Sequence, residues 1–137
     1  MENKSNIQVR IRPKTIYSLK PGEIFVFGSN LQGNHAGGAA RIAHQFFGAI
    51  MGCGVGIQGQ SYAIPTMHGG IDAISPYVDQ FINFAKSNPN LKFLVTRIGC
   101  GIAGFKDEEI APLFQRAMDI ENIYLPREFV EWLNNNK

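Results

Sequence analysis

Short apolar runs and helically spaced apolar residues alternate along this chain. An apolar–polar alternation over residues 7–11 predicts a first strand. Compact apolar runs bounded by glycine, proline or polar residues predict further strands at residues 23–27, 61–64, 92–96 and 123–125.

The segments between these runs carry apolar residues three or four positions apart, the period of a helix with one buried face. Ser75 followed by Pro76 has the pattern of an N-cap and a first helical residue. We therefore expect four helices, beginning near Gly38, at Pro76, near Asp107 and at Pro126.

Strands that alternate with helices favour an α/β fold with one mainly parallel, mixed sheet covered on both faces. We expect a three-layer α/β/α arrangement that uses the whole chain, residues 1–137, as a single domain. In such sheets the loops that follow parallel strands gather at one edge, and ligands bind in the crevice there. The position of a motif relative to that edge therefore decides what it can do.

Two glycine-rich segments follow predicted strands and precede predicted helices. One runs from Gly28 to Gly38, and the other contains Gly99, Gly101 and Gly104 in RIGCGIAGF, a G-x-G-x-x-G spacing. Glycine leaves room for backbone N–H groups to approach an oxyanion, and a helix N-terminus attracts one. Two such loops at one edge predict a binding site in which a pyrophosphate is held from two sides. Tight turns that only pack helices onto the sheet are the alternative.

The same spacing recurs at Gly54, Gly56 and Gly59, but there it follows a helix and precedes a strand. We therefore expect these glycines at the opposite edge of the sheet, in a flexible turn. Gln58 or Gln60 could still reach a ligand from the side.

A Rossmann dinucleotide site is the weaker interpretation of residues 99–104. That fingerprint normally opens the first strand–helix unit and is followed by an acidic residue that binds a ribose. Here it lies late in the chain, and the next strand ends in Leu-Pro-Arg at residues 125–127.

Composition and charge narrow the range of partners. A net charge of +2, with scattered Lys and Arg, does not predict bulk nucleic-acid binding. No apolar run approaches the ~20 residues of a membrane span, and MENKSNIQVRIRPK lacks the apolar core of a signal peptide. Cys53 and Cys100 form no metal-ligand spacing with each other or with the histidines. We expect reduced thiols in the cytoplasm, no metal site and no cofactor.

Several segments together resemble the macrodomain family, which binds ADP-ribose. The likeness covers roughly residues 5–128 and is carried by IFVFGSN, GNHAGGAA, SYAIPT, FLVTRIGCGIAGF and NIYLP. The RIGCG segment is similar to the branch that includes ADP-ribosyl-ester hydrolases. Small proteins of phage and prophage origin share the FGSN…GQSYAIPT…RIGCG pattern.

The resemblance implies an ADP-ribose pocket and a set of ligand-binding positions. Asn30 would face a ribose, and Phe105 would pack near the distal ribose. The implied phosphate contacts are the backbone N–H groups of Gly37, Gly38 and Ala39 on one side and of Gly99, Cys100, Gly101, Ile102, Ala103 and Gly104 on the other.

The chain departs from the hydrolase branch at its catalytic positions. Ala103 stands where that branch has an aspartate, and Thr-Met-His at residues 66–68 stands where it has a nucleophilic lysine. The acid that orients adenine in many macrodomains would fall in RPKT at residues 12–15, which contains none. Binding is therefore expected more firmly than hydrolysis of an ADP-ribosyl bond, which stays open.

Other side chains near the predicted loops carry chemistry of their own. His68, after the strand that ends near Pro65, is the preferred general base, with a surface histidine as the alternative. Asp107 opens a helix, where a carboxylate complements the helix dipole, but it could also position a water molecule. His35 could contact a phosphate or ribose, or be a solvated loop residue.

Cys100 and Arg97 are expected to have structural roles and not catalytic ones. A phosphatase-like loop needs Cys-x5-Arg, whereas the sixth residue after Cys100 is Lys106, so a small buried thiol is expected. Arg97 needs a partner for its charge, and a structural ion pair is expected, with phosphate contact as the alternative.

The sequence thus predicts a cytoplasmic, macrodomain-like protein of a bacterial host or phage-infected cell. Its expected partner is a small nucleotide such as ADP-ribose, or an ADP-ribosylated macromolecule, with no membrane or bulk nucleic acid. A protein–protein interaction module with a vestigial pocket is the runner-up. Bulky side chains of Phe105 or Met67 projecting into the cleft would favour it.

Overall fold

The computed structural model describes residues 10–136. The strand predicted at residues 7–11 therefore lies mostly outside the described residues. Its last residue, Ile11, forms a parallel bridge with Leu125. Within residues 10–136, no helix is both long enough and apolar enough to pass through a bilayer.

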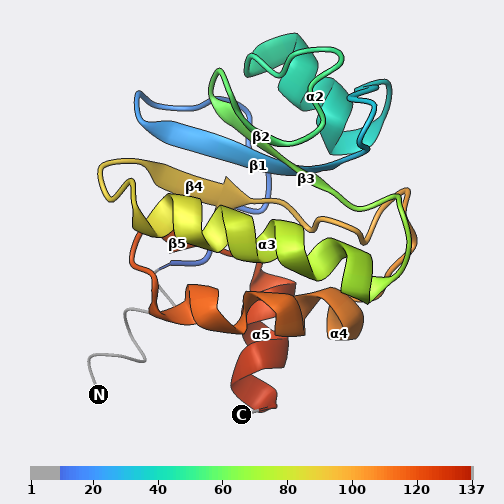
Figure 1. Ribbon diagram of the computed structural model, residues 1–137. Coiled ribbons are helices and arrows are strands. Elements are labelled where there is room, and N and C mark those ends of the chain that lie inside the picture. The colour runs from blue at the N-terminus through green and yellow to red at the C-terminus, as the bar shows by residue number, and fades with distance from the viewer. Residues whose placement is uncertain (1–9, 137) are drawn as a thin grey trace.

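The described strands form one five-stranded mixed sheet, which confirms the predicted α/β class (Figure 1). Its order is β2-β3-β1-β4-β5, and only β2 runs antiparallel to its neighbour. The strands are β1 (Glu23–Ser29), β2 (Gly56–Gln58), β3 (Ser61–Pro65), β4 (Lys92–Val95) and β5 (Ile123–Tyr124).

Helices cover both faces of the sheet, so the architecture has the three predicted layers (Figure 1). One face carries α2 (Gly38–Phe46). The other carries α3 (Ile71–Lys86), α4 (Asp107–Ile110), the 3-10 helix η1 (Ala111–Asp119) and α5 (Arg127–Asn135).

The central strand β1 shows how the sequence separates two hydrophobic cores. Phe25 and Phe27 belong to the core under α2, whereas Ile24 and Val26 belong to the larger core under α3 and η1. Successive side chains of a strand point to opposite faces, so a strand buried on both faces is apolar throughout. This burial fixes β1 at the centre of the sheet, with its end at the predicted ligand edge.

The start of α3 differs from the prediction. The helix begins at Ile71 with Gly70 as N-cap, and Pro76 lies inside it, so Ser75 is not the cap. Proline costs the helix one backbone hydrogen bond at this point. Ile74, which is only 1% exposed, extends the buried stripe one turn toward the N-terminus and offsets that loss.

The helix predicted from Asp107 begins there but does not continue as one α-helix. It ends after four residues and continues as the 3-10 helix η1, with a kink at Phe114 (φ −100°, ψ 15°). Pro112 has no N–H to donate to the carbonyl of Glu108, which interrupts the α-helical hydrogen bonds at the junction.

The segment with Gly54, Gly56 and Gly59 contains a strand that was not predicted, and its position corrects the expected edge. Because β2 is antiparallel to β3, with Gly56 opposite Ala63 and Gln58 opposite Ser61, its first residues approach the C-terminal edge of the parallel strands. Gly54 lies behind the first glycine-rich loop, where its carbonyl accepts a 2.5 Å hydrogen bond from Ser29 Oγ. Only the Gly59 end lies at the opposite edge.

Candidate functional site

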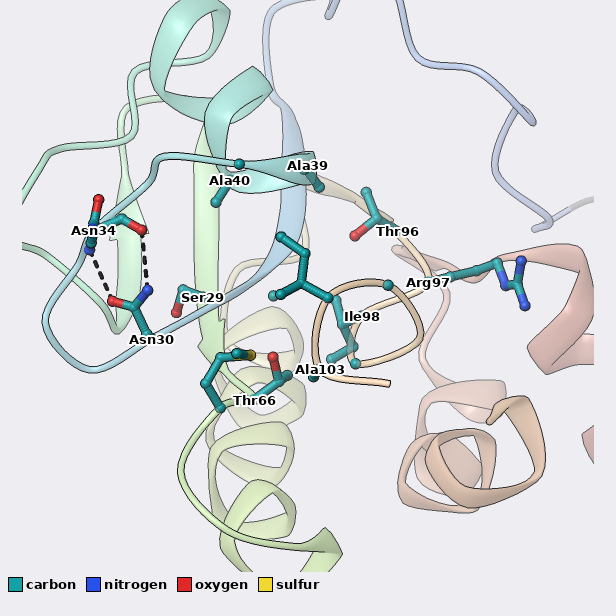
Figure 2. Close-up of a pocket in the computed structure, with 17 residues that line it drawn as sticks. Ser29, Asn30, Asn34, Ala39, Ala40, Thr66, Thr96, Arg97, Ile98 and Ala103 are labelled. Atoms are coloured by element: carbon teal, nitrogen blue, oxygen red, sulfur yellow. Dashed lines mark hydrogen bonds between the residues drawn. The ribbon is translucent and has the colours of Figure 1, made fainter. Parts of the chain in front are cut away.

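A cavity of about 220 Å³ opens at the C-terminal edge of β1, β3 and β4, between the two glycine-rich loops (Figure 2). All three loops that follow these strands contribute to its wall. The lining residues are Gly28, Ser29, Asn30, Asn34, Gly37, Gly38, Ala39, Ala40, Thr66, Met67, Thr96, Arg97, Ile98, Gly99, Gly101, Ile102 and Ala103.

The loops meet at the floor of this cavity, around Gly28. A Cβ atom on Gly28 would lie 3.2 Å from Thr66 Oγ1 and 3.5 Å from the backbone nitrogen of Gly99. Glycine therefore lets the chain ends of three strands come together. The two loops lie side by side at one crevice, as the spacing of the glycines predicts.

The second loop turns sharply at Gly99, whose φ of +76° is in the left-handed region. Internal bonds close the turn, from Cys100 N to Arg97 O at 3.1 Å and from Phe105 N to Gly99 O at 2.7 Å. Within residues 10–136, no intramolecular acceptor meets the backbone N–H groups of Gly99, Gly101, Ile102 and Ala103. These four residues line the cavity.

The first loop delivers the N-terminus of α2 to the same cavity. Gly37 is the N-cap and supplies no capping side chain, and Arg41 N donates to Gly37 O at 3.2 Å to close the first helical turn. Within the described chain, the amides of Gly38, Ala39 and Ala40 have no acceptor, as expected for a first helical turn. A helix N-terminus with free amides attracts anions.

The side chain of Asn30 makes two hydrogen bonds to the backbone of Asn34, which close a turn in the first loop (Figure 2). Its Nδ2 donates to Asn34 O at 3.1 Å, and its Oδ1 accepts from Asn34 N at 2.9 Å. A primary amide has a second N–H and a second lone pair. Asn30 lines the cavity, and within residues 10–136 one N–H and one lone pair of its side-chain amide are still available to a ligand.

His35 lies behind this loop, not in the cavity. It is 1% exposed, so the expectation of a solvated loop histidine is wrong. Its ring stands edge-on to Phe27, with centroids 5.3 Å apart, and Nε2 lies 3.1 Å from Cys53 O. No hydrogen-bond partner meets its Nδ1 within the described residues. Burial against β1 gives His35 a packing role in the first loop.

Ile102 extends from the second loop toward the start of α2. The residue is 74% exposed, yet its Cδ1 would lie 3.4 Å from a Cβ atom on Gly37 and 3.6 Å from one on Gly38. The tip of the second loop therefore rests over the start of α2.

Arg97, Asp107 and Cys100 form a cluster that turns away from the cavity. Arg97 Nη2 lies 2.8 Å from Asp107 Oδ2, which confirms the predicted ion pair, and Figure 2 shows the Arg97 side chain extending away from the cavity. Cys100 Sγ donates to Asp107 Oδ1 at 3.5 Å. Burial, followed by the adjacent Asp107 carboxylate, raises the pKa of the Cys100 thiol to about 12. A neutral thiol is a poor nucleophile, which supports a packing role.

His68 is exposed and lies beside the cavity, in the loop after β3. Its Nε2 accepts a hydrogen bond from the backbone N–H of Leu31 at 2.7 Å. The imidazole therefore holds the first loop, and it lines a neighbouring hollow together with Leu31.

The predicted ligand-binding positions divide into two groups. Those that line the cavity are Asn30, Gly37, Gly38, Ala39, Gly99, Gly101, Ile102 and Ala103. Those that lie outside its lining are His35, Cys100, Gly104 and Phe105, together with the catalytic candidates His68 and Asp107. Phe105 packs against the core, so it does not fill the cleft.

Sequence reasoning missed the side chains that complete the cavity wall, chiefly Asn34, Thr66 and Thr96. Met67, which the sequence offers as a sign of the interaction module, does line the cavity. Thr66 and Thr96 directly follow β3 and β4, and a first polar residue after a buried parallel strand is a usable signal for this edge. No protein-family model, curated protein or solved structure matches the chain. Within residues 10–136, no group of three His, Cys, Asp or Glu side chains is arranged to hold a metal ion.

Proposed function

We propose that this protein binds ADP-ribose or a related NAD-derived nucleotide and grips the pyrophosphate between its two glycine-rich loops. One observation carries the proposal. Two loops bring backbone N–H groups without an acceptor in residues 10–136 to a single cavity, one set from the start of α2 and one from residues 99–103. Converging backbone amides of this kind favour phosphate oxygens.

The size of the cavity supports binding of the diphosphate part of a nucleotide. A volume of about 220 Å³ is smaller than the roughly 300–1,000 Å³ of pockets that enclose a whole ligand. A pyrophosphate and an adjoining sugar would occupy the cavity, and the nucleobase would lie outside it.

The lining favours binding over catalysis. Among the described residues, the wall contains no Asp, Glu, His or Lys side chain, and the guanidinium of Arg97 is engaged with Asp107. The resemblance to macrodomains then suggests a protein that recognises ADP-ribosylated molecules or sequesters an NAD-derived signal. The free thiols of Cys53 and Cys100 fit a cytoplasmic location, in a bacterial or phage-infected cell.

Parallel calorimetric titrations with ADP-ribose, NAD, AMP and cyclic ADP-ribose test the proposal. ADP-ribose is expected to bind at least about tenfold more tightly than AMP, because charge-assisted hydrogen bonds to the second phosphate contribute roughly 1.5–3 kcal/mol. Absence of heat with all four nucleotides would contradict the proposal and favour an interaction module.

Hydrolysis is tested separately, by release of ADP-ribose from an ADP-ribosylated protein. Wild type is compared with His68→Ala and Asp107→Ala. Equal release by all three would remove both residues as catalysts, and loss in one variant with unchanged ADP-ribose affinity would assign it a catalytic role.

A further inference from the structure

A second hollow, of about 410 Å³, adjoins the cavity at the loops that follow β1 and β3. Asn30 and Met67 line the cavity, and the residues next to them in the chain, Leu31 and His68, line the hollow. On the side of the hollow, Leu31 N donates a 2.7 Å hydrogen bond to His68 Nε2, which ties the two loops together there. One ligand can therefore extend from the cavity into the hollow.

The hollow is largely apolar. One wall is a single face of α3, because Ala73, Pro76, Tyr77 and Gln80 recur at helical spacing. Its remaining lining residues are Leu31, Pro65, His68 and Ile74.

Three polar groups stand among these apolar surfaces. His68 accepts through Nε2, so its proton is on Nδ1, which is free to donate. Gln80 supplies an amide that donates and accepts, and Tyr77 supplies a hydroxyl. Within residues 10–136, no hydrogen bond occupies His68 Nδ1, the Gln80 amide or the Tyr77 hydroxyl.

This combination fits a planar heterocycle. A nucleobase has two apolar faces and an edge of donors and acceptors, and aromatic side chains stack on such faces. We propose that the hollow binds the nucleobase of the nucleotide whose diphosphate lies in the cavity. The inference rests on the proposed function, because a diphosphate in the cavity would place the base near Leu31 and His68.

The experiment uses two probes that differ only by the nucleoside: inorganic pyrophosphate and ADP. Wild type and Tyr77→Ala are titrated with both by calorimetry. Loss of a stacked base is expected to weaken ADP binding at least about fivefold in Tyr77→Ala, while pyrophosphate affinity stays unchanged. Tyr17→Ala is the matched control, because Tyr17 is 89% exposed and lies outside both lining sets.

Gln80→Ala provides a second variant, because Gln80 is exposed and its loss leaves the α3 core intact. It is expected to weaken ADP binding about two- to tenfold, again without change for pyrophosphate.

Three results would overturn the assignment. Unchanged ADP affinity in both variants would place the base elsewhere while leaving the diphosphate site intact. An equal loss of affinity for ADP and pyrophosphate would show that the substitution disturbs the phosphate-binding loops and not a contact with the base. Absence of pyrophosphate and ADP binding to wild type would remove the proposed function and this inference together.

Discussion

The imidazole of His68 accepts a 2.7 Å hydrogen bond from the backbone N–H of Leu31. The loop after β3 therefore supports the loop after β1, through the side chain that the sequence offers as a general base. His68→Ala should weaken pyrophosphate binding about two- to tenfold, the net worth of one lost hydrogen bond. Calorimetry of the variant measures this loss. An unchanged affinity would show that the contact does not order the first loop.

Gly99 should be the least replaceable glycine of the second loop. Its φ is +76°, and a Cβ atom there would lie 2.9 Å from Ile110 Cδ1. Gly99→Ala is expected to lower the free energy of unfolding by at least about 1–2 kcal/mol, the cost of left-handed backbone for an L-residue. Urea denaturation measures the change.

Gly101→Ala is the control for that substitution. A Cβ atom on Gly101 would meet nothing within 4 Å, and the φ angle of Gly101 is not positive. Its unfolding free energy should stay within about 0.5 kcal/mol of wild type. Equal destabilisation of both variants would contradict the role given to the turn at Gly99.

Ile102 should affect ligand retention more than stability, because the residue is 74% exposed, lines the cavity and extends toward the start of α2. Ile102→Ala is expected to weaken ADP-ribose binding about three- to tenfold, which corresponds to one or two methylene groups that lose their contact with a bound ligand. Ile57→Ala, on β2, is the matched control outside the cavity lining. A similar loss in both variants would argue against a specific contact.

Cys100 should stay unreactive at moderately alkaline pH, because burial and Asp107 raise the pKa of its thiol to about 12. In native protein at pH 8, iodoacetamide should label Cys100 far more slowly than in unfolded protein, as followed by mass spectrometry. Asp107→Asn should accelerate labelling only in part, because burial is the larger cause. Rapid labelling of native wild type would contradict the assigned environment.

The same raised pKa of Cys100 predicts that the stability of the protein decreases as the pH rises. The pKa of the Cys100 thiol is higher in the folded than in the unfolded protein. Its contribution to the free energy of unfolding is therefore fully present at pH values below the unfolded pKa. It is lost as pH rises toward about 12, because the unfolded thiol ionises first. The stability advantage of wild type over Cys100→Ala should therefore shrink above pH 9, as urea denaturation would measure. A constant difference would contradict this.

The sequence could predict the elements that depend on local pattern. The apolar runs at β1 and β4 fixed the central strands, and glycine after each strand placed both loops at one edge. Features set by distant contacts were missed. His35 is buried because Phe27 and Cys53 surround it, and Thr66 enters the cavity because β3 runs parallel beside β1.

The start of α3 shows a different limit of local reasoning. Ser75 and Pro76 match a helix start, yet tertiary burial of Ile74 extends the helix past them toward the N-terminus. Local propensity is a weak signal where packing decides.

In the proposed complex, backbone amides of both loops hold one anion. Two-dimensional ¹H–¹⁵N NMR of the protein titrated with pyrophosphate tests this most directly. We expect the largest downfield amide shifts on Gly38, Ala39 and Ala40 in the first loop and on Gly99, Gly101, Ile102 and Ala103 in the second, with matching saturation curves. Shifts confined to one loop, or spread over the surface without saturation, would contradict it.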